Sequence, residues 1–259
     1  MNIDAYVSNV QLGLQKLKEL VSTINDIVEN RIEKNLKVVS KALLVDLPEN
    51  ASFTLSEFVS MQQQHIKSKS ILLQGKNTEI RNAFNDLVGK ILAFDIEDAI
   101  APVASEDIEK LRKHYNHFVY QALLHSAKNS MNSLKKRMGS RSGMFILNSL
   151  NSLRPFFHVD VQLMPPRVSL SPSLDDIQEC INQSAQAILS CYKTVFDWEN
   201  VAEIESANEG KHNFFERITK DIELVRVALL LTGCIQGVRN TVAEYLDSFS
   251  KVRNFVFCF

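Results

Sequence analysis

Apolar residues recur at alternating intervals of four and three positions along the first part of the chain. The series contains Ile3, Val7, Val10, Leu14, Leu17, Val21, Ile24 and Val28. This spacing places them on one face of an α-helix over nearly four heptads. Residues 2–45 contain no proline and a single glycine, so we expect one helix of about 65 Å.

The spacing changes frame after Val28, because Arg31 and Asn35 occupy the next positions of the series. Apolar residues resume one position later, at Ile32, Leu36, Val39 and Leu43. This change resembles a stutter, at which a supercoil locally unwinds.

The apolar face is also wider than that of a two-stranded coiled coil. Tyr6, Leu20 and Ile27 lie beside the series, at positions where such a coil carries charges. We therefore interpret this stretch as a bundle helix that touches two neighbours. Its predicted helix-packing residues are Val7, Val10, Leu14, Leu17, Val21, Ile24 and Val28.

A second helix is expected after a turn at residues 46–50. Thr54 precedes Glu57 by three positions, the spacing of a capping box, and Phe53 and Phe58 occupy the positions of a hydrophobic staple. The short connection predicts an antiparallel return along the first helix. A third helix is expected from Ser105 to about residue 138, before Gly139.

Period-two alternation predicts one β-hairpin. Apolar residues alternate with polar ones over 157–163, and a second short run at 168–170 follows Pro165-Pro166. Ser173 and Asp176 have the spacing of another capping box and begin a fourth helix that ends near Trp198. Residues 199–212 are interpreted as a polar loop, and 215–249 as a single fifth helix.

These elements predict a mainly α fold, an elongated antiparallel bundle of long helices with one short β-hairpin near residues 156–171. The chain has only 8 glycines and 6 prolines among 259 residues, which favours long helices. We expect a three-helix bundle at residues 1–139, a connection at 140–155, and a hairpin with two helices at 156–259.

Composition narrows the range of partners. The formal net charge of -1 gives no general attraction to nucleic acid or anionic membranes. The longest apolar run, residues 227–235, is much shorter than the ~20 residues that span a bilayer. Cys180 and Cys191 are interpreted as small core residues, and the spacing of the 4 cysteines fits a reducing compartment. We expect a soluble protein with no nucleic-acid, membrane or small-molecule partner.

No pattern in the chain predicts catalysis. Gly75-Lys76 lies within a helical pattern and lacks the upstream glycine of a phosphate-binding loop. His114, His117 and His125 share one side of the third helix; a solvated face is the simpler interpretation than a metal site, because no further ligand completes the set. We predict no catalytic residue, no cofactor and no metal.

Two further patterns allow two interpretations each. A basic run could face an acidic partner, but it also suits the C-terminal end of a helix; it comprises Lys128, Lys135, Lys136, Arg137 and Arg141. The spacing of Gly233 and Gly237 indicates either close helix packing or a kink.

The order of several short patches is similar to that in dynein heavy-chain tails, most closely those of cilia and flagella. The first helix passes through Ile24, Ile27-Val28 and Asn30-Arg31-Ile32, reaches Asp46-Leu47-Pro48, and is followed by Thr54, Glu57 and Phe58. Residues 172–178, PSLDDIQ, resemble the start of a later tail helix, and residues 215–218, 220–221, 231–233 and 236–237 also match. The patches lie between residues 20 and 250.

The resemblance implies a non-catalytic segment of an axonemal dynein heavy-chain tail, in the cytoskeleton of the cilium. It would support intermediate-chain binding, heavy-chain assembly and force transmission, with intermediate chains and other tail segments as partners. The family's linker, ATP-hydrolysing motor and stalk fall outside these patches, and the sequence after Ser250 departs from the family pattern. We therefore expect a truncated product, a split gene model or a fragment.

The alternative is an unrelated helical-bundle adaptor or a membrane-curvature scaffold. Such a scaffold would need a basic stripe along its long helices, whereas residues 2–45 mix acids and bases.

Overall fold

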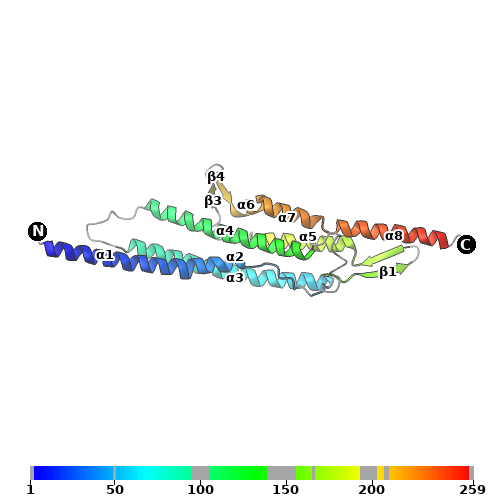
Figure 1. Ribbon diagram of the computed structural model, residues 1–259, viewed down its shortest axis with the longest axis horizontal. Helices are drawn as coiled ribbons and strands as arrows, with labels where there is room; N and C mark the ends of the chain where they lie inside the picture. The colour runs from blue at the N-terminus through cyan, green and yellow to red at the C-terminus, as the bar shows by residue number, and fades with distance from the viewer. Residues whose placement is uncertain are drawn as a thin grey trace. The chain divides into compact units, whose positions relative to one another are not determined.

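The computed structural model describes residues 3–48, 51–94, 105–138, 156–164, 167–192, 203–206 and 210–256 (Figure 1). Its helical elements are α1 (Ile3–Asp26), η1 (Ile27–Glu33), α2 (Lys34–Lys41), α3 (Leu55–Leu92), α4 (Ser105–Met138), α5 (Leu174–Cys191), α6 (Phe214–Lys220), α7 (Ile222–Thr232) and α8 (Gln236–Val256). The strands are β1 (Asp160–Met164), β2 (Arg167–Ser171), β3 (Glu203–Ser206) and β4 (Gly210–Asn213). The predicted mainly α fold with a short hairpin is confirmed.

The first predicted helix is continuous from α1 through η1 to α2, and its middle part is a π-helix. The π-helix falls where the apolar spacing changes frame. A π-helical turn accommodates an extra residue within an α-helix, so the apolar residues after the change stay on one face with those before it. Ile27, Ile32 and Val39 are accordingly buried.

The predicted hairpin is formed by β1 and β2, which pair antiparallel from Asp160 opposite Ser171 to Met164 opposite Arg167. A second antiparallel hairpin was missed: β3 and β4 pair from Glu203 opposite Asn213 to Ser206 opposite Gly210, in the stretch interpreted as a loop. Its sequence has no apolar alternation, because Ile204 is the only large apolar residue of the two strands. Backbone hydrogen bonds alone hold this hairpin together, so the side-chain pattern of the sequence does not indicate it.

The prediction of a single fifth helix was wrong, because the chain forms α6, α7 and α8 there. Asp221 adopts an extended backbone and its carboxylate accepts from the N–H groups of Glu223 and Leu224, both at 3.1 Å, so it caps α7. Gly233 ends α7, and α8 begins three residues later. The two breaks are therefore made by a cap and a glycine inside an otherwise helical pattern.

Reciprocal side-chain bonds hold the starts of α3 and α5. The Glu57 N–H donates to Thr54 Oγ1 at 3.3 Å, and the Thr54 N–H donates to Glu57 Oε2 at 2.9 Å. The backbone hydrogen bond from Thr54 is the main reason that the pKa of Glu57 lies below its usual value. Ser173 and Asp176 make the same pair of bonds, each at 3.1 Å.

The chain divides into two compact units: unit 1 contains residues 1–42, 70–126 and 194–217, and unit 2 contains 43–69, 127–193 and 218–259. Each unit combines segments from both sides of residues 140–155, which lie outside the described residues. The predicted division into domains at 1–139 and 156–259 thus stays a prediction.

Unit 1 is held by the first helical stretch, the C-terminal part of α3 and the N-terminal part of α4. Its buried apolar residues include Ile32, Val39, Phe84, Leu87 and Leu123. Arg31 forms an ion pair with Asp86, and Ser126 Oγ donates to the Ala42 carbonyl at 2.7 Å.

Unit 2 contains an aromatic cluster at the start of α3. The ring of Phe58 lies 5.4 Å from that of Phe156 and 5.5 Å from that of Phe157, both edge-on. The N–H of Phe53 donates to the Phe156 carbonyl at 2.8 Å, and Arg137 donates to the Ala51 carbonyl at 3.0 Å. The residues before β1 are thus fixed against the start of α3.

Candidate interaction surfaces

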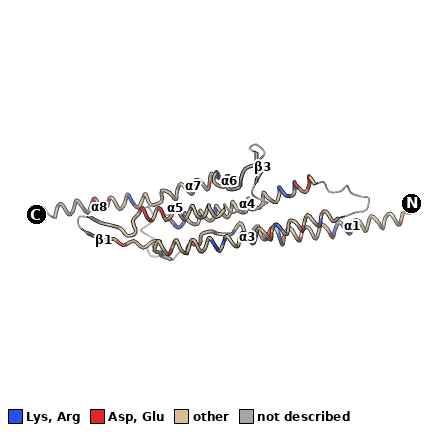
Figure 2. The backbone as a smooth tube through the Cα atoms, turned by 180° about the vertical axis from the view of Figure 1, so that it is seen from behind, with Lys and Arg blue, Asp and Glu red and all other residues tan. Residues whose placement is uncertain are grey.

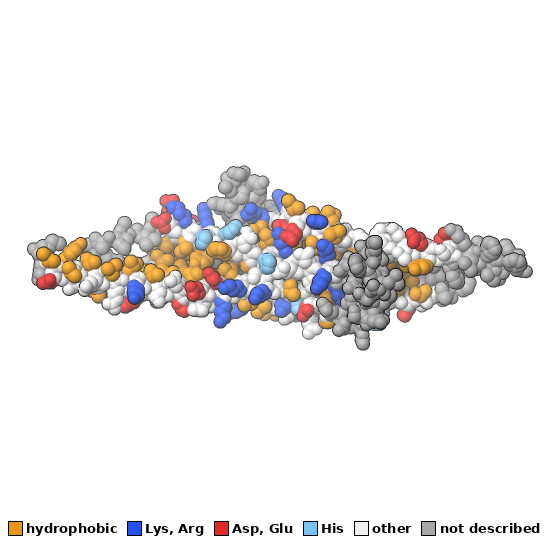
Figure 3. Space-filling model, viewed as in Figure 1, with side chains coloured by type: hydrophobic (Ala, Val, Ile, Leu, Met, Phe, Trp, Pro, Cys, Tyr) orange, Lys and Arg blue, Asp and Glu red, His pale blue; other side chains and the backbone are white. Residues whose placement is uncertain are grey.

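One apolar surface lies on the N-terminal part of α1. We call it the α1 stripe: Ile3, Val7, Val10, Leu14, Leu17 and Val21. All six side chains are exposed in the described part of the chain, with Leu14 at 61%, and Figure 3 shows a row of hydrophobic side chains along this end of the helix.

The remaining predicted packing residues lie further along the same helical stretch. Ile24 and Val28 are half-buried, and the neighbouring Ile27 is 3% exposed. The predicted face is therefore packed only from about Ile24 onward, and its role as a helix-packing surface before that point stays a prediction.

A groove of about 440 Å³ lies in unit 1 between the first helical stretch and α4. It is lined by Val28, Glu33, Leu36, Lys37, Ser40, His114, Tyr115, Phe118 and Ala122. Phe118 is 43% exposed, and its ring lies 4.7 Å from that of His114. Burial, and next the charge of Glu33, raise the pKa of Tyr115, so its hydroxyl stays neutral at physiological pH.

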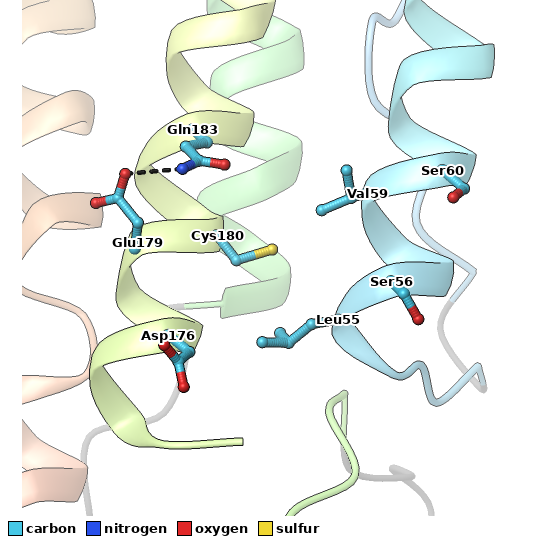
Figure 4. A pocket seen from close by; sticks show the side chains of 8 residues that line it. All are labelled: Leu55, Ser56, Val59, Ser60, Asp176, Glu179, Cys180 and Gln183. Carbon is cyan, nitrogen blue, oxygen red and sulfur yellow. Dashed lines mark hydrogen bonds between the residues drawn. The ribbon is translucent and has the colours of Figure 1, made fainter. Parts of the chain in front are cut away.

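A second hollow, also of about 440 Å³, lies in unit 2 between α3 and α5 (Figure 4). Its lining residues are Leu55, Ser56, Val59, Ser60, Asp176, Glu179, Cys180 and Gln183. Gln183 donates to Glu179 at 2.9 Å. Burial raises the pKa of the Cys180 thiol, which keeps it protonated and a poor nucleophile.

Sequence patterns missed the contact that joins α5 to the end of α7. Gln178 Nε2 donates to the Leu231 carbonyl at 2.9 Å, and its Oε1 accepts from the Ile235 N–H at 3.3 Å. One side chain therefore satisfies backbone groups on both sides of the break at Gly233. The sequence indicates this contact only through the position of the polar Gln178 next to Ile177 and near Ile181, which are both buried.

Nearly the whole chain aligns with known proteins. It is 34% identical over 255 residues to the dynein gamma chain of the flagellar outer arm of Chlamydomonas reinhardtii, and this match covers 97% of the chain. It is 21% identical to mouse dynein axonemal heavy chain 5 and 20% identical to human dynein axonemal heavy chain 8, over 97% and 98% of the chain. No protein-family model matches it.

The chain is homologous to axonemal dynein heavy chains. The resemblance to this family is confirmed. The chain spans 5% of the length of the Chlamydomonas relative and 7% of the mouse and human ones.

The residues of the predicted basic run make separate contacts. Lys128 pairs with Asp221 at 3.2 Å and with Glu223 at 2.8 Å. The guanidinium of Arg137 lies 5.1 Å from the centre of the Phe156 ring. Figure 2 shows basic and acidic residues mixed along α3 and α4. Arg141 and Trp198 lie outside the described residues.

The glycine pair marks a break in the chain. Gly233 lies in the turn between α7 and α8, and a Cβ placed at Gly233 or Gly237 would meet no atom within 4 Å. The kink is therefore the correct interpretation, and close packing was wrong for the described residues.

The described residues contain no group of three or more His, Cys, Asp or Glu side chains arranged to hold a metal ion. None of their helices combines the length and the hydropathy needed to cross a bilayer.

Proposed function

We propose that this chain is a non-catalytic segment of an axonemal dynein heavy-chain tail that supports subunit assembly and force transmission in ciliary movement. Its partners would be dynein intermediate chains and other heavy-chain tail segments, and it would be located in the axoneme. The observation that carries the proposal is the alignment of 97% of the chain with a flagellar outer-arm heavy chain at 34% identity.

Long helices suit a segment that joins dynein subunits and transmits force. α3 has 38 residues and α4 has 34, and both contribute to unit 1 and to unit 2. A continuous helix resists extension through its whole ladder of backbone hydrogen bonds, so it carries load between the regions that it joins. Exposed apolar faces on α1 and α7 provide lateral surface for partners, with Ile222 of α7 at 85% exposure.

A non-catalytic role is supported by the location of the Gly75-Lys76 pair. Gly75 and Lys76 lie in the middle of α3, where the backbone N–H groups are bonded within the helix. Such groups are not available to cradle a phosphate, as those of a nucleotide-binding loop are.

The test is recovery of partners from ciliary extract by the tagged 259-residue chain, with retained proteins identified by mass spectrometry. We expect dynein intermediate chains or other heavy chains to be recovered. The control is Leu123→Asp, which places a charge at a fully buried site and should abolish recovery together with folding. A folded wild-type chain that retains no dynein subunit would overturn the assembly role, and measurable ATP binding would overturn the non-catalytic one.

A further inference from the structure

The groove of unit 1 combines aromatic rings with a carboxylate. One wall is α4, which contributes Tyr115 and Phe118, and the other is the first helical stretch, which contributes Glu33. The ring centres of Tyr115 and Phe118 lie 6.4 Å apart. Burial, and next the charge of Glu33, raise the pKa of Tyr115, so the carboxylate lies close to the aromatic wall. Figure 3 shows hydrophobic side chains gathered between these helices.

The exposed ring of Phe118 has the chemistry of a cation-binding surface. A guanidinium lies over three other aromatic rings of the chain: that of Arg112 is 6.0 Å from the centre of Phe84, that of Arg137 is 5.1 Å from Phe156, and that of Arg217 is 5.4 Å from Tyr120. Among the described residues, no Lys or Arg lies over the ring of Phe118, which is 43% exposed. The negative face of such a ring attracts a cation.

Glu33 has a cationic neighbour that is easily displaced. Its carboxylate lies 3.5 Å from the ammonium of Lys37, one turn further along the same helix, and the two side chains are 49% and 72% exposed. An exposed pair of this kind contributes little stability. A guanidinium can replace the ammonium, because it bonds a carboxylate through two N–H groups and also stacks on an aromatic ring.

We propose that the groove of unit 1 binds an arginine side chain of a partner protein, in a segment where apolar residues flank the arginine. The guanidinium lies over Phe118 and bonds to Glu33, and Lys37 moves aside. The flanking apolar residues cover Val28 and Leu36, which line the groove and are half-buried. This inference rests on the proposed assembly role, which supplies the partner, and adds the chemistry by which the partner is recognised.

The test is a titration of the full chain, with ¹³C-labelled Leu and Val methyl groups, with a blocked Leu-Arg-Leu tripeptide followed by NMR. We expect saturable shifts of the methyl signals of Val28 and Leu36, and none at Leu55 and Val59, which line the hollow in unit 2. Replacing the arginine by the neutral isostere citrulline should weaken binding by about tenfold, because both the ring contact and the ion pair are lost.

Variants of the groove should change the affinity in opposite directions. Glu33→Gln should weaken binding of the arginine peptide by about threefold. Phe118→Leu, which keeps an apolar side chain but removes the ring face, should have an effect of about the same size. Lys37→Ala should strengthen binding by about twofold, because it removes the competing ammonium. The matched control is Glu29→Gln, the same charge change at an exposed residue outside the lining of the groove, which should leave binding unchanged.

Several results would overturn the proposal. These are the absence of shifts at Val28 and Leu36, equal binding of the arginine and citrulline peptides, and equal effects of Glu29→Gln and Glu33→Gln, which would indicate general charge attraction. Shifts of the same signals that depend only on the concentration of the chain would show that a second copy fills the groove. None of these results depends on the recovery of dynein subunits from ciliary extract, so failure of the proposed function is observed separately.

Discussion

Single polar side chains fix several helix ends in this chain. Asp221 caps α7, Gln178 bonds backbone groups on both sides of the break after α7, and Ser126 donates to the Ala42 carbonyl at the end of the first helical stretch. Gln178 and Ser126 join segments that are far apart in sequence, and each of the three residues satisfies backbone groups that the ends of helices leave unpaired.

At this scale we predict that Gln178→Leu destabilises the protein. The substitution keeps the size of the side chain but removes the acceptor for Ile235 and the donor for Leu231, at a cost of about 1–3 kcal/mol in the free energy of unfolding. Denaturant unfolding followed by circular dichroism measures the effect.

The matched control is Gln183→Leu, an exposed residue of the same helix whose amide donates to Glu179. It should change stability by less than about 0.5 kcal/mol, as surface substitutions usually do. Equal effects of the two substitutions would show that the bonds from Gln178 add nothing to stability.

At the scale of elements, the π-helix η1 reconciles two frames of apolar residues in one helix. The residues up to Val28 and those from Ile32 onward differ by one position from a strict 4-3 series. The extra residue is accommodated within η1. The change of frame in the sequence therefore explains why the helix is a π-helix at this place.

Deleting Glu29, an exposed residue of η1, should therefore be tolerated. The shortened sequence restores the 4-3 series and permits a regular α-helix, and we expect the free energy of unfolding to change by no more than about 2 kcal/mol. Thermal unfolding followed by circular dichroism is the measurement.

Deletion of Gln64, an exposed residue inside the α-helix α3, is the comparison. It rotates everything after it by about 100° relative to the residues before it and should abolish cooperative unfolding. If the two deletions were equally damaging, η1 would not be acting as an inserted residue.

At the scale of the whole molecule, the two compact units each have a core of their own. Leu87 is buried in unit 1 and Ile181 in unit 2, both at 1% exposure. The helices α3 and α4 belong to both units, so the units are joined by continuous backbone.

We predict that destabilising one core raises hydrogen exchange mainly in its own unit. Leu87→Ala and Ile181→Ala should each cost about 2–5 kcal/mol, and each serves as the control for the other. Hydrogen exchange read by mass spectrometry should show the larger increase at 70–92 for the first variant and at 174–191 for the second. A uniform increase in both variants would show one cooperative unit.

The sequence by itself determined the elements whose causes are local. The period of the apolar residues predicted the long helices and the change of frame, and residue spacing predicted the starts of α3 and α5 and the first hairpin. These features depend on neighbours within a few positions along the chain, so a linear pattern contains them.

Only the tertiary structure decided which apolar residues are covered. Leu14 and Ile32 belong to the same helical face, yet one is 61% exposed and the other is fully buried. Phe118 is exposed beside a groove although it lies one helical turn from the buried Ala122, and β3 pairs with β4 without any apolar alternation. Burial depends on segments that are distant in sequence, and core and interface residues share one pattern until their neighbours are known.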